Sequence, residues 1–224
     1  NTAALGVALG LVRDDITLAE EVLREYFGGE TGEQNARAAR AGFEHARRSV
    51  GGGLTFTRGL SPHGDRMLLN GNEAIALGAL AGGCRFMAAY PMTPVTPIME
   101  YLASKSKEMG MVIFQPEDEI AAINAVVGAA YAGARAMTAT SGGGFSLMVE
   151  GLSLAGMTET PMVVVLGQRP GPAIGLPTRT EQGELWFAIH AGHGEFPRAV
   201  LAPGNADEAF WLTIHAFNLA ERYQ

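Results

Sequence analysis

Two groups of residues in this 224-residue chain have types and spacings that could do chemistry. The acidic run Glu117-Asp118-Glu119 follows a short apolar run, and Arg169 and Arg179 flank a loop rich in proline and glycine. A carboxylate at the end of a strand is well placed to meet a cofactor, and two guanidiniums on a rigid loop suit a carboxylate or phosphate. Simpler explanations stand beside both, since acidic residues favour the first turn of any helix and loop arginines are often solvated.

The remaining candidate residues carry weaker signals. The run Gly142-Gly143-Gly144 follows an expected strand and could present backbone N–H groups to an anion, although a tight turn explains it as well. Thr93 lies between two prolines and could simply cap the next helix. A metal site at His190, His193 and Glu195 is disfavoured, because the glycines on either side of His193 break helical spacing.

Composition narrows the class of protein. The chain carries a net charge of −7 and shows no basic stripe, so we expect no nucleic-acid partner. Its single cysteine, Cys84, excludes an intramolecular disulfide framework and fits a reducing, cytoplasmic setting. No apolar run reaches the roughly 18 residues of a membrane span, so we expect neither a membrane segment nor a signal peptide.

Two features predict that this chain is part of something larger. Charged residues make up 17% of it, against about 25% in typical soluble domains. A chain with so few charges often buries part of its surface against a partner. The chain begins at Asn1 without a methionine and ends at Gln224 directly after a helical pattern. We therefore expect a truncated, internal piece of a longer protein.

Residues 1–50 are expected to be helical. Thr17, with Glu20 three residues later, is typical of a capping box, here opening a helix that runs to about Phe27. A second helix is expected over 35–49. The stretch 51–66 is rich in glycine and predicts a linker and a domain boundary.

Beyond residue 66 strands and helices alternate, which predicts an α/β fold, a parallel sheet with helices on both faces. The expected strands are 85–89, 111–114, 135–140, 162–166 and 199–201. The expected helices are 73–81, 94–107, 119–134, 145–156 and 185–190. Ligands of such sheets bind beyond the carboxyl ends of the strands, which is where most of the candidate residues lie.

The helix expected over 119–134 presents mainly alanine and glycine. Small side chains let another backbone approach closely. Packing inside the domain explains this face, and a close contact with another subunit is the alternative.

Six short motifs follow one another in the second part of the chain: Tyr90-Pro91-Met92-Thr93-Pro94, Glu117-Asp118-Glu119-Ile120-Ala121-Ala122, Thr138-Ala139-Thr140-Ser141-Gly142, Gly156-Met157-Thr158-Glu159-Thr160-Pro161, Gln168-Arg169-Pro170-Gly171-Pro172 and Gly175-Leu176-Pro177-Thr178-Arg179-Thr180-Glu181-Gln182. Their types and order resemble the alpha subunits of 2-oxoacid:ferredoxin oxidoreductases, of the 2-oxoglutarate type. The resemblance covers about residues 67–210 and implies that 67–224 is a domain that binds the pyrimidine half of thiamine diphosphate. Residues 1–50 resemble the C-terminal end of the gamma domain that some members fuse ahead of alpha.

The resemblance implies roles for individual residues. Glu119 would bond the pyrimidine nitrogen N1′ and stabilise the tautomer whose 4′-imino group takes the C2 proton. The cofactor side of the site would be lined by three further residues: Tyr90, Pro91 and Thr93. Thr93 would also face the carbonyl and carboxylate of the substrate. Arg169 would lie near the substrate or coenzyme A, and Arg179 is a second candidate for the substrate carboxylate.

Three places depart from the family pattern, which has proline at Gly143, serine at Val95 and serine-threonine at Ala173-Ile174. The last two changes remove hydroxyl groups near the expected site. They bear on substrate preference more than on cofactor binding.

The resemblance also implies that the active site forms only between subunits. The Mg²⁺ and diphosphate site and a [4Fe–4S] cluster would belong to a partner beta subunit, and one cysteine cannot supply the four ligands of a cluster. Coenzyme A would be a co-substrate and ferredoxin would take the electrons. A second alpha chain is expected, and this chain itself would hold no metal.

The implied reaction is the oxidative decarboxylation of a 2-oxo acid, in particular 2-oxoglutarate, to an acyl-CoA, with the fragment alone inactive. A non-catalytic scaffold that retains the fold is the main alternative, and a need for Glu119 would separate the two. A third hypothesis is a thiamine enzyme that does not use ferredoxin. The motifs at 90–94 and 168–172 argue against it.

Overall fold

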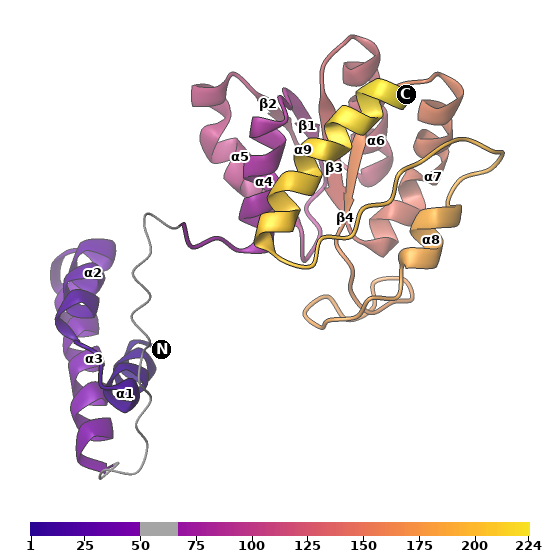
Figure 1. Ribbon diagram of the computed structural model, residues 1–224. Helices are drawn as coiled ribbons and strands as arrows, with labels where there is room; N and C mark the ends of the chain where they lie inside the picture. The colour runs from indigo at the N-terminus through magenta and orange to yellow at the C-terminus, as the bar shows by residue number, and fades with distance from the viewer. Residues whose placement is uncertain (50–66) are drawn as a thin grey trace. The chain divides into compact units, whose positions relative to one another are not determined.

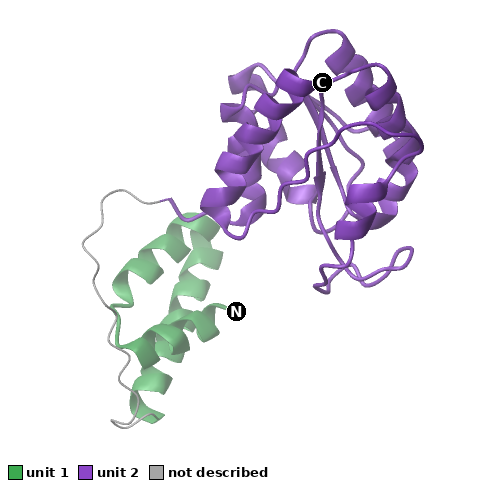
Figure 2. Ribbon diagram, turned by 45° about the vertical axis from the view of Figure 1, so that its right-hand side comes forward, with its two compact units in different colours: residues 1–66 green, residues 67–224 purple. Residues whose placement is uncertain are grey.

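The computed structural model describes residues 1–49 and 67–224, and the chain divides into two compact units, Asn1–Arg66 and Met67–Gln224 (Figure 2). The linker expected over 51–66 lies outside the described residues. Within the two described ranges, no helix combines the length and hydropathy that crossing a membrane requires.

The described part of the first unit is helical, with α1 (Thr2–Val12), α2 (Thr17–Phe27) and α3 (Gly29–Ser49). Helices α1 and α3 approach closely because Gly6 has no side chain; a Cβ atom there would overlap the carbonyl group of Ala39. Helix α3 begins at Gly29 rather than at residue 35 as expected. Gly28, with a φ of 65°, ends α2 and lets the chain turn directly into α3.

The N-terminus of α2 is capped differently from the expectation. The N–H and the hydroxyl group of Thr17 both donate to Asp15 Oδ1, at 2.9 and 2.8 Å. Glu20 does not return to the helix start, because its carboxylate pairs with Arg40 of α3, with Arg40 Nη2 at 2.6 Å from Glu20 Oε2. The expected capping box is therefore absent: Asp15 binds Thr17 ahead of the helix, and Glu20 forms an ion pair between helices.

In the second unit, the described residues form a parallel four-stranded sheet in the order β2-β1-β3-β4 (Figure 1). The strands are β1 (Phe86–Ala88), β2 (Val112–Phe114), β3 (Ala136–Thr140) and β4 (Val163–Leu166). In the register, Met87 lies opposite Ile113 and Ala139 lies opposite Val165. The predicted parallel sheet is confirmed.

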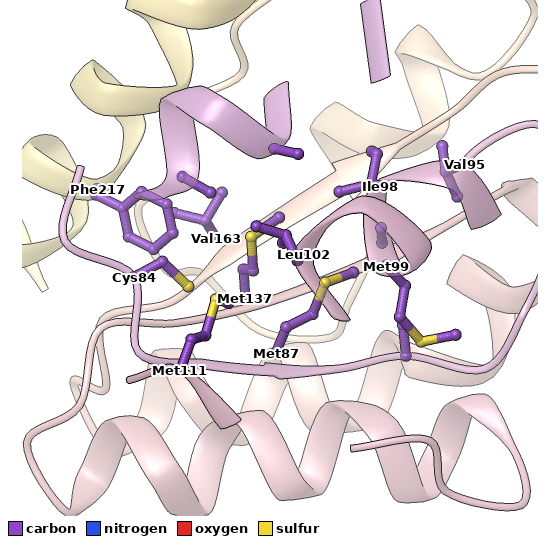
Figure 3. Packing of buried hydrophobic residues seen from close by; sticks show 14 residues of the cluster. Cys84, Met87, Val95, Ile98, Met99, Leu102, Met111, Met137, Val163 and Phe217 are labelled. Atoms are coloured by element: carbon purple, nitrogen blue, oxygen red, sulfur yellow. The ribbon is translucent and has the colours of Figure 1, made fainter. Parts of the chain in front are cut away.

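Helices cover both faces of this sheet, also as predicted. They are α4 (Gly71–Ala81), α5 (Thr96–Met109) and α9 (Ala206–Tyr223) on one face, and α6 (Glu119–Tyr131) and α7 (Gly142–Met157) on the other, with α8 (Leu185–His190) after β4 (Figure 1). Alternate strand residues supply the two faces. Met87 and Met137 pack with α5 and with Phe217 of α9 (Figure 3), whereas Ala88 packs with Val126 of α6.

Helix α4 illustrates how capping and close packing determine where these helices begin and how they lie against one another. It begins with a capping box, in which Asn70 Oδ1 accepts the N–H of Glu73 at 3.0 Å and Glu73 Oε2 accepts the N–H of Asn70 at 2.9 Å. It then packs against α9 at Gly78, where a Cβ atom would lie 2.5 Å from the carbonyl oxygen of Phe210.

The small-residue face expected on α6 divides between two environments. Ala122 and Ala130 are buried within the second unit. Gly128 is exposed, and a Cβ atom there would meet no other atom within 4 Å. Packing inside the domain therefore accounts for part of the face, and the rest is open.

The strand expected over 199–201 does not form. Segment 196–203 and strand β4 both line a cavity of about 910 Å³, so this segment is not paired with the edge of the sheet. Pro197 and Pro203 lie at its two ends and have no N–H groups to donate to a neighbouring strand. Strand β4 is thus the edge of the described sheet.

Candidate active site

The candidate residues gather at the carboxyl edge of the sheet, because parallel strands all end on that side. The loop after β1 carries Tyr90, Pro91 and Thr93, and α6 starts with Glu119 shortly after β2 ends. The loop after β4 carries Arg169. Three separate chain segments thus bring the predicted residues to one edge.

Glu119 is held in a buried position by the start of α6. Asp118 caps the helix, with its Oδ1 atom accepting the N–H of Ala121 at 2.7 Å. Glu119 follows as the first helical residue and is only 4% exposed. Its Oε1 atom is buried and has no hydrogen-bond partner among the described residues. Buried polar atoms are almost always paired, so an unpaired one is unusual. This oxygen is available to accept a hydrogen bond from a ligand.

The space beside Glu119 depends on the start of α7. Helix α7 begins at Gly142 and not at residue 145 as expected, so the glycine run forms its first turn. A Cβ atom at Gly144 would lie 2.8 Å from both Cγ and Oε1 of Glu119 and would overlap the hydroxyl group of Thr140. Glycine at 144 therefore leaves room for the carboxylate. Thr140 in turn donates to Met92 Sδ at 3.7 Å, which links this side of the site to the loop after β1.

Arg169 and Thr93 are in direct contact across 76 positions of sequence. Arg169 is 7% exposed, and its Nη1 atom donates to the backbone carbonyl oxygen of Thr93 at 2.7 Å. The loop that carries Thr93 is also fixed from α4, because Asn72 Nδ2 donates to the carbonyl oxygen of Pro94 at 2.9 Å. Thr93 itself is exposed, on a backbone that these two hydrogen bonds hold in place.

The other expected site residues lie farther out. Tyr90 is 39% exposed, and Pro91 is half-buried beside it. Arg179 is exposed; its backbone N–H donates to the carbonyl oxygen of Leu176 at 3.0 Å, so the turn around it is ordered. Arg169 is therefore inserted into the site, and Arg179 lies on the surface of the loop.

Glu184, which was not among the predicted site residues, has its carboxylate at the start of α7. A Cβ atom at Gly142 would overlap Glu184 Oε1, and Glu184 Oε2 is buried without a partner among the described residues. Burial raises the pKa of this carboxyl group, against the opposite effect of the backbone N–H groups of Arg169 and Gly142. No local signal separates Glu184 from the exposed Glu181 in the sequence, because its partners are distant in the chain.

The side chains of the candidate site fit some ligands better than others. The buried, unpaired Oε1 atom of Glu119 can accept a hydrogen bond, which fits a ring nitrogen that carries a proton. In the described parts of the chain, no group of three or more His, Cys, Asp or Glu side chains is arranged to hold a metal ion. The ring of His190 packs against that of Trp186 in a tilted arrangement, with ring centroids 4.2 Å apart.

Residues 77–224 match the protein family described as pyruvate flavodoxin/ferredoxin oxidoreductase, thiamine diphosphate-binding. Two curated relatives illustrate the similarity. The chain is 52% identical over 171 residues to 2-oxoacid:ferredoxin oxidoreductase 1, subunit alpha, of Sulfurisphaera tokodaii, covering 71% of this chain and 27% of that protein. It is 47% identical over 156 residues to the 2-oxoglutarate synthase subunit KorA of Archaeoglobus fulgidus, covering 70% and 45%. The chain spans less than half the length of either relative.

A solved structure is similar over almost the whole chain. It is a 2-oxoglutarate:ferredoxin oxidoreductase from Magnetococcus marinus, with 2-oxoglutarate, coenzyme A and succinyl-CoA bound. The TM-score is 0.87 at 40% sequence identity, and the match covers 98% of this chain and 39% of that chain.

Proposed function

This chain belongs to the thiamine diphosphate-binding family of pyruvate flavodoxin/ferredoxin oxidoreductases, and we propose that it is part of the alpha subunit of a 2-oxoglutarate:ferredoxin oxidoreductase. The complete enzyme would oxidatively decarboxylate 2-oxoglutarate to succinyl-CoA and pass the electrons to ferredoxin. The names of the Archaeoglobus relative and the Magnetococcus structure support this substrate over other 2-oxo acids.

One observation carries the proposal: a buried glutamate with an unpaired oxygen at the carboxyl edge of the sheet. Thiamine diphosphate, when bound, supplies the nucleophilic carbon and the electron sink that decarboxylation of a 2-oxo acid needs. Glu119 Oε1 would accept a hydrogen bond from the N–H group at the pyrimidine nitrogen N1′. The hydrogen bond favours the cofactor tautomer that acts as the base, so Glu119 acts on the reaction through the pyrimidine ring. Tyr90 and Pro91 would line the same side of the site.

Thr93 and Arg169 would bind the substrate. The Arg169 guanidinium uses Nη1 for the carbonyl oxygen of Thr93, and an arginine has five N–H donors, so others are available for a carboxylate. The fixed backbone at Thr93 would direct its hydroxyl group toward the carbonyl of the 2-oxo acid. Arg179, on the outer part of the loop, would reach the second carboxylate of 2-oxoglutarate.

The remaining parts of the catalytic machinery would come from other chains. We place the Mg²⁺ and diphosphate site and a [4Fe–4S] cluster on a beta subunit, with coenzyme A as co-substrate, ferredoxin as acceptor and a second alpha chain in the complex. Cys84 is buried in the core, and a cluster needs four cysteine thiolates. Residues 1–50 would be the end of a gamma-like domain fused ahead of alpha.

The test is the reduction of a viologen dye that depends on both 2-oxoglutarate and coenzyme A. The full-length alpha chain and its beta subunit are assayed as wild type, Glu119→Gln and Glu117→Gln. Loss of a group that controls proton transfer typically costs about 10²–10⁴ in rate, and we expect that loss for Glu119→Gln. Glu117→Gln is the matched control, because Glu117 is exposed two residues away and is expected to keep wild-type activity.

Equal rates for the wild type and Glu119→Gln would refute the assignment of Glu119. A folded, cofactor-loaded complex without activity on any 2-oxo acid would favour the scaffold hypothesis. A clear preference for another 2-oxo acid would leave the reaction class in place and correct the substrate.

A further inference from the structure

We propose that Glu184 is a positioning residue of this site: its carboxylate fastens the loop 168–184 to the N-terminus of α7 and so holds Arg169 against Thr93. The proposal concerns contacts within this chain. What the loop positions, namely the substrate side of a 2-oxo acid site, rests on the function proposed above.

The first attachment is at the start of α7. The leading N–H groups of a helix have no partner within the helix, and their positive dipole end favours a carboxylate. Ser141 is the N-cap of α7, but its side chain makes no capping hydrogen bond, and its hydroxyl oxygen is buried and unpaired among the described residues. Glu184 Oε1 lies so close to Gly142 that any side chain at position 142 would displace the carboxylate. The carboxylate from a distant loop therefore occupies the place of a helix cap.

The second attachment is at the base of the loop. The backbone N–H of Arg169 acts on the same carboxylate and lowers its pKa. The backbone N–H of Glu184 donates to Gln168 Oε1 at 3.0 Å, so the two ends of the loop are bound to each other. The carbonyl oxygen of Glu184 accepts the N–H of Ala188 at 2.8 Å, which ties this end to α8.

The consequence reaches the substrate side through Arg169. Its neighbour Gln168 accepts the backbone N–H of Glu184, and its own side chain donates to the carbonyl oxygen of Thr93, so Glu184 connects α7 to the segment that carries both expected substrate-binding residues. Glu119 is held separately, by the cap of α6. Removal of the Glu184 carboxylate should thus disturb substrate binding and spare the contact to the pyrimidine ring.

The charge balance at Glu184 argues against a role in stability alone. The facing charged groups are Arg169, which favours the carboxylate, and Glu181, which opposes it. Burial is the largest effect and raises the pKa, so the ionised form is less favourable in the folded chain than in the unfolded chain. A neutral side chain of the same shape is therefore expected to leave the unfolding midpoint unchanged or higher.

Hydrogen exchange on the assembled enzyme tests the fastening without any assay of activity. We expect Glu184→Ala to accelerate exchange at the N–H groups of Gly142 and Arg169 by about tenfold, the effect of losing one buried hydrogen-bond partner. Gln182→Ala is the matched control, since Gln182 lies in the same loop, is exposed and carries no charge that would act on Glu184. Equal exchange in the two variants would overturn the proposal.

Kinetics test the consequence for substrate. Glu184→Ala is expected to raise the KM for 2-oxoglutarate by about tenfold, because binding contacts are lost. The Kd for thiamine diphosphate should stay within about twofold of wild type, because Glu119 is held independently. Glu184→Gln keeps an oxygen that accepts one N–H, so it should recover much of the KM without a lower unfolding midpoint. An unchanged KM in Glu184→Ala, with exchange accelerated, would refute the positioning role.

Failure of the Glu184 proposal can be distinguished from failure of the proposed function. A wild-type complex without oxo-acid-dependent activity refutes the proposed function, and the exchange result still decides whether Glu184 fastens the loop. If Glu184→Ala does not fold, the same measurements on Glu184→Gln decide: a lowered unfolding midpoint would show a structural role and overturn the proposal.

Discussion

Glu119 keeps a buried oxygen that none of the described residues satisfies. An unpaired buried polar atom typically costs about 1–3 kcal/mol of folding free energy. The fold tolerates this cost beside Gly144, where only a residue without a side chain leaves room for the carboxylate, and the same atom would gain a partner if a ligand supplied an N–H. Buried groups that lack partners in the protein are expected at sites that bind something else.

Cys84, unlike Glu119, is a chemically reactive side chain that burial makes unreactive. It is fully buried in the core, its thiol donates to the carbonyl oxygen of Phe86 at 3.4 Å, and burial raises its pKa to about 12. Because the thiolate is the reactive form, we expect no modification by a thiol reagent at pH 8 in the native chain. In denaturant one equivalent should react, since Cys84 is the only cysteine. Stoichiometric labelling of the native chain within minutes would contradict the buried placement.

At the scale of elements, one ion pair joins α2 to α3 in the first unit. The Glu20 side chain is 7% exposed and that of Arg40 is 47% exposed. The hydrogen bond from Arg40 is the main cause that lowers the pKa of the Glu20 carboxyl group. A lowered pKa means that the ionised form is stabilised by folding. The stability it adds is present above the ordinary pKa of a glutamate and is lost as the pH falls through the lowered value.

Urea unfolding followed by circular dichroism checks this pH dependence. At neutral pH, Glu20→Gln is expected to unfold at lower urea than wild type, and the difference should shrink in acid as the wild-type carboxylate becomes protonated. Glu21→Gln is the control, because Glu21 is exposed on the next position of the same helix. A difference that persists unchanged in acid would show that the pair contributes nothing through its charge.

Whole elements followed from the sequence more reliably than their ends did. The parallel sheet and the two layers of helices were predictable, because buried strands and amphipathic helices leave periodic patterns. The cap of α2 was not, since Glu20 has a stronger partner on another helix. The strand expected over 199–201 was a wrong prediction. Its apolar residues suggested a strand, but pairing with β4 also depends on where the whole segment lies.

At the scale of the molecule, the sequence predicted that the candidate residues share the carboxyl edge of the sheet, and the structure brings most of them there. The order of motifs indicated that Glu119 starts a helix and that Arg169 belongs to the loop after β4. It did not reveal that Arg169 donates to the backbone of Thr93, because that contact uses a carbonyl oxygen, which every residue has. Glu184 was missed for a related reason, since its carboxylate lies against the backbone of Gly142, which is distant in the sequence and has no side chain to mark the contact.

The contact between Gly142 and Glu184 has a consequence for how this domain can vary. A side chain at position 142 and a carboxylate at position 184 compete for the same volume. Substitution at one position alone removes or displaces the helix cap, whereas paired substitutions can exchange one cap for another. The two positions are therefore epistatic, and we expect them to co-vary among natural homologues. Transfer of the loop 168–184 between family members should succeed only when position 142 is transferred with it.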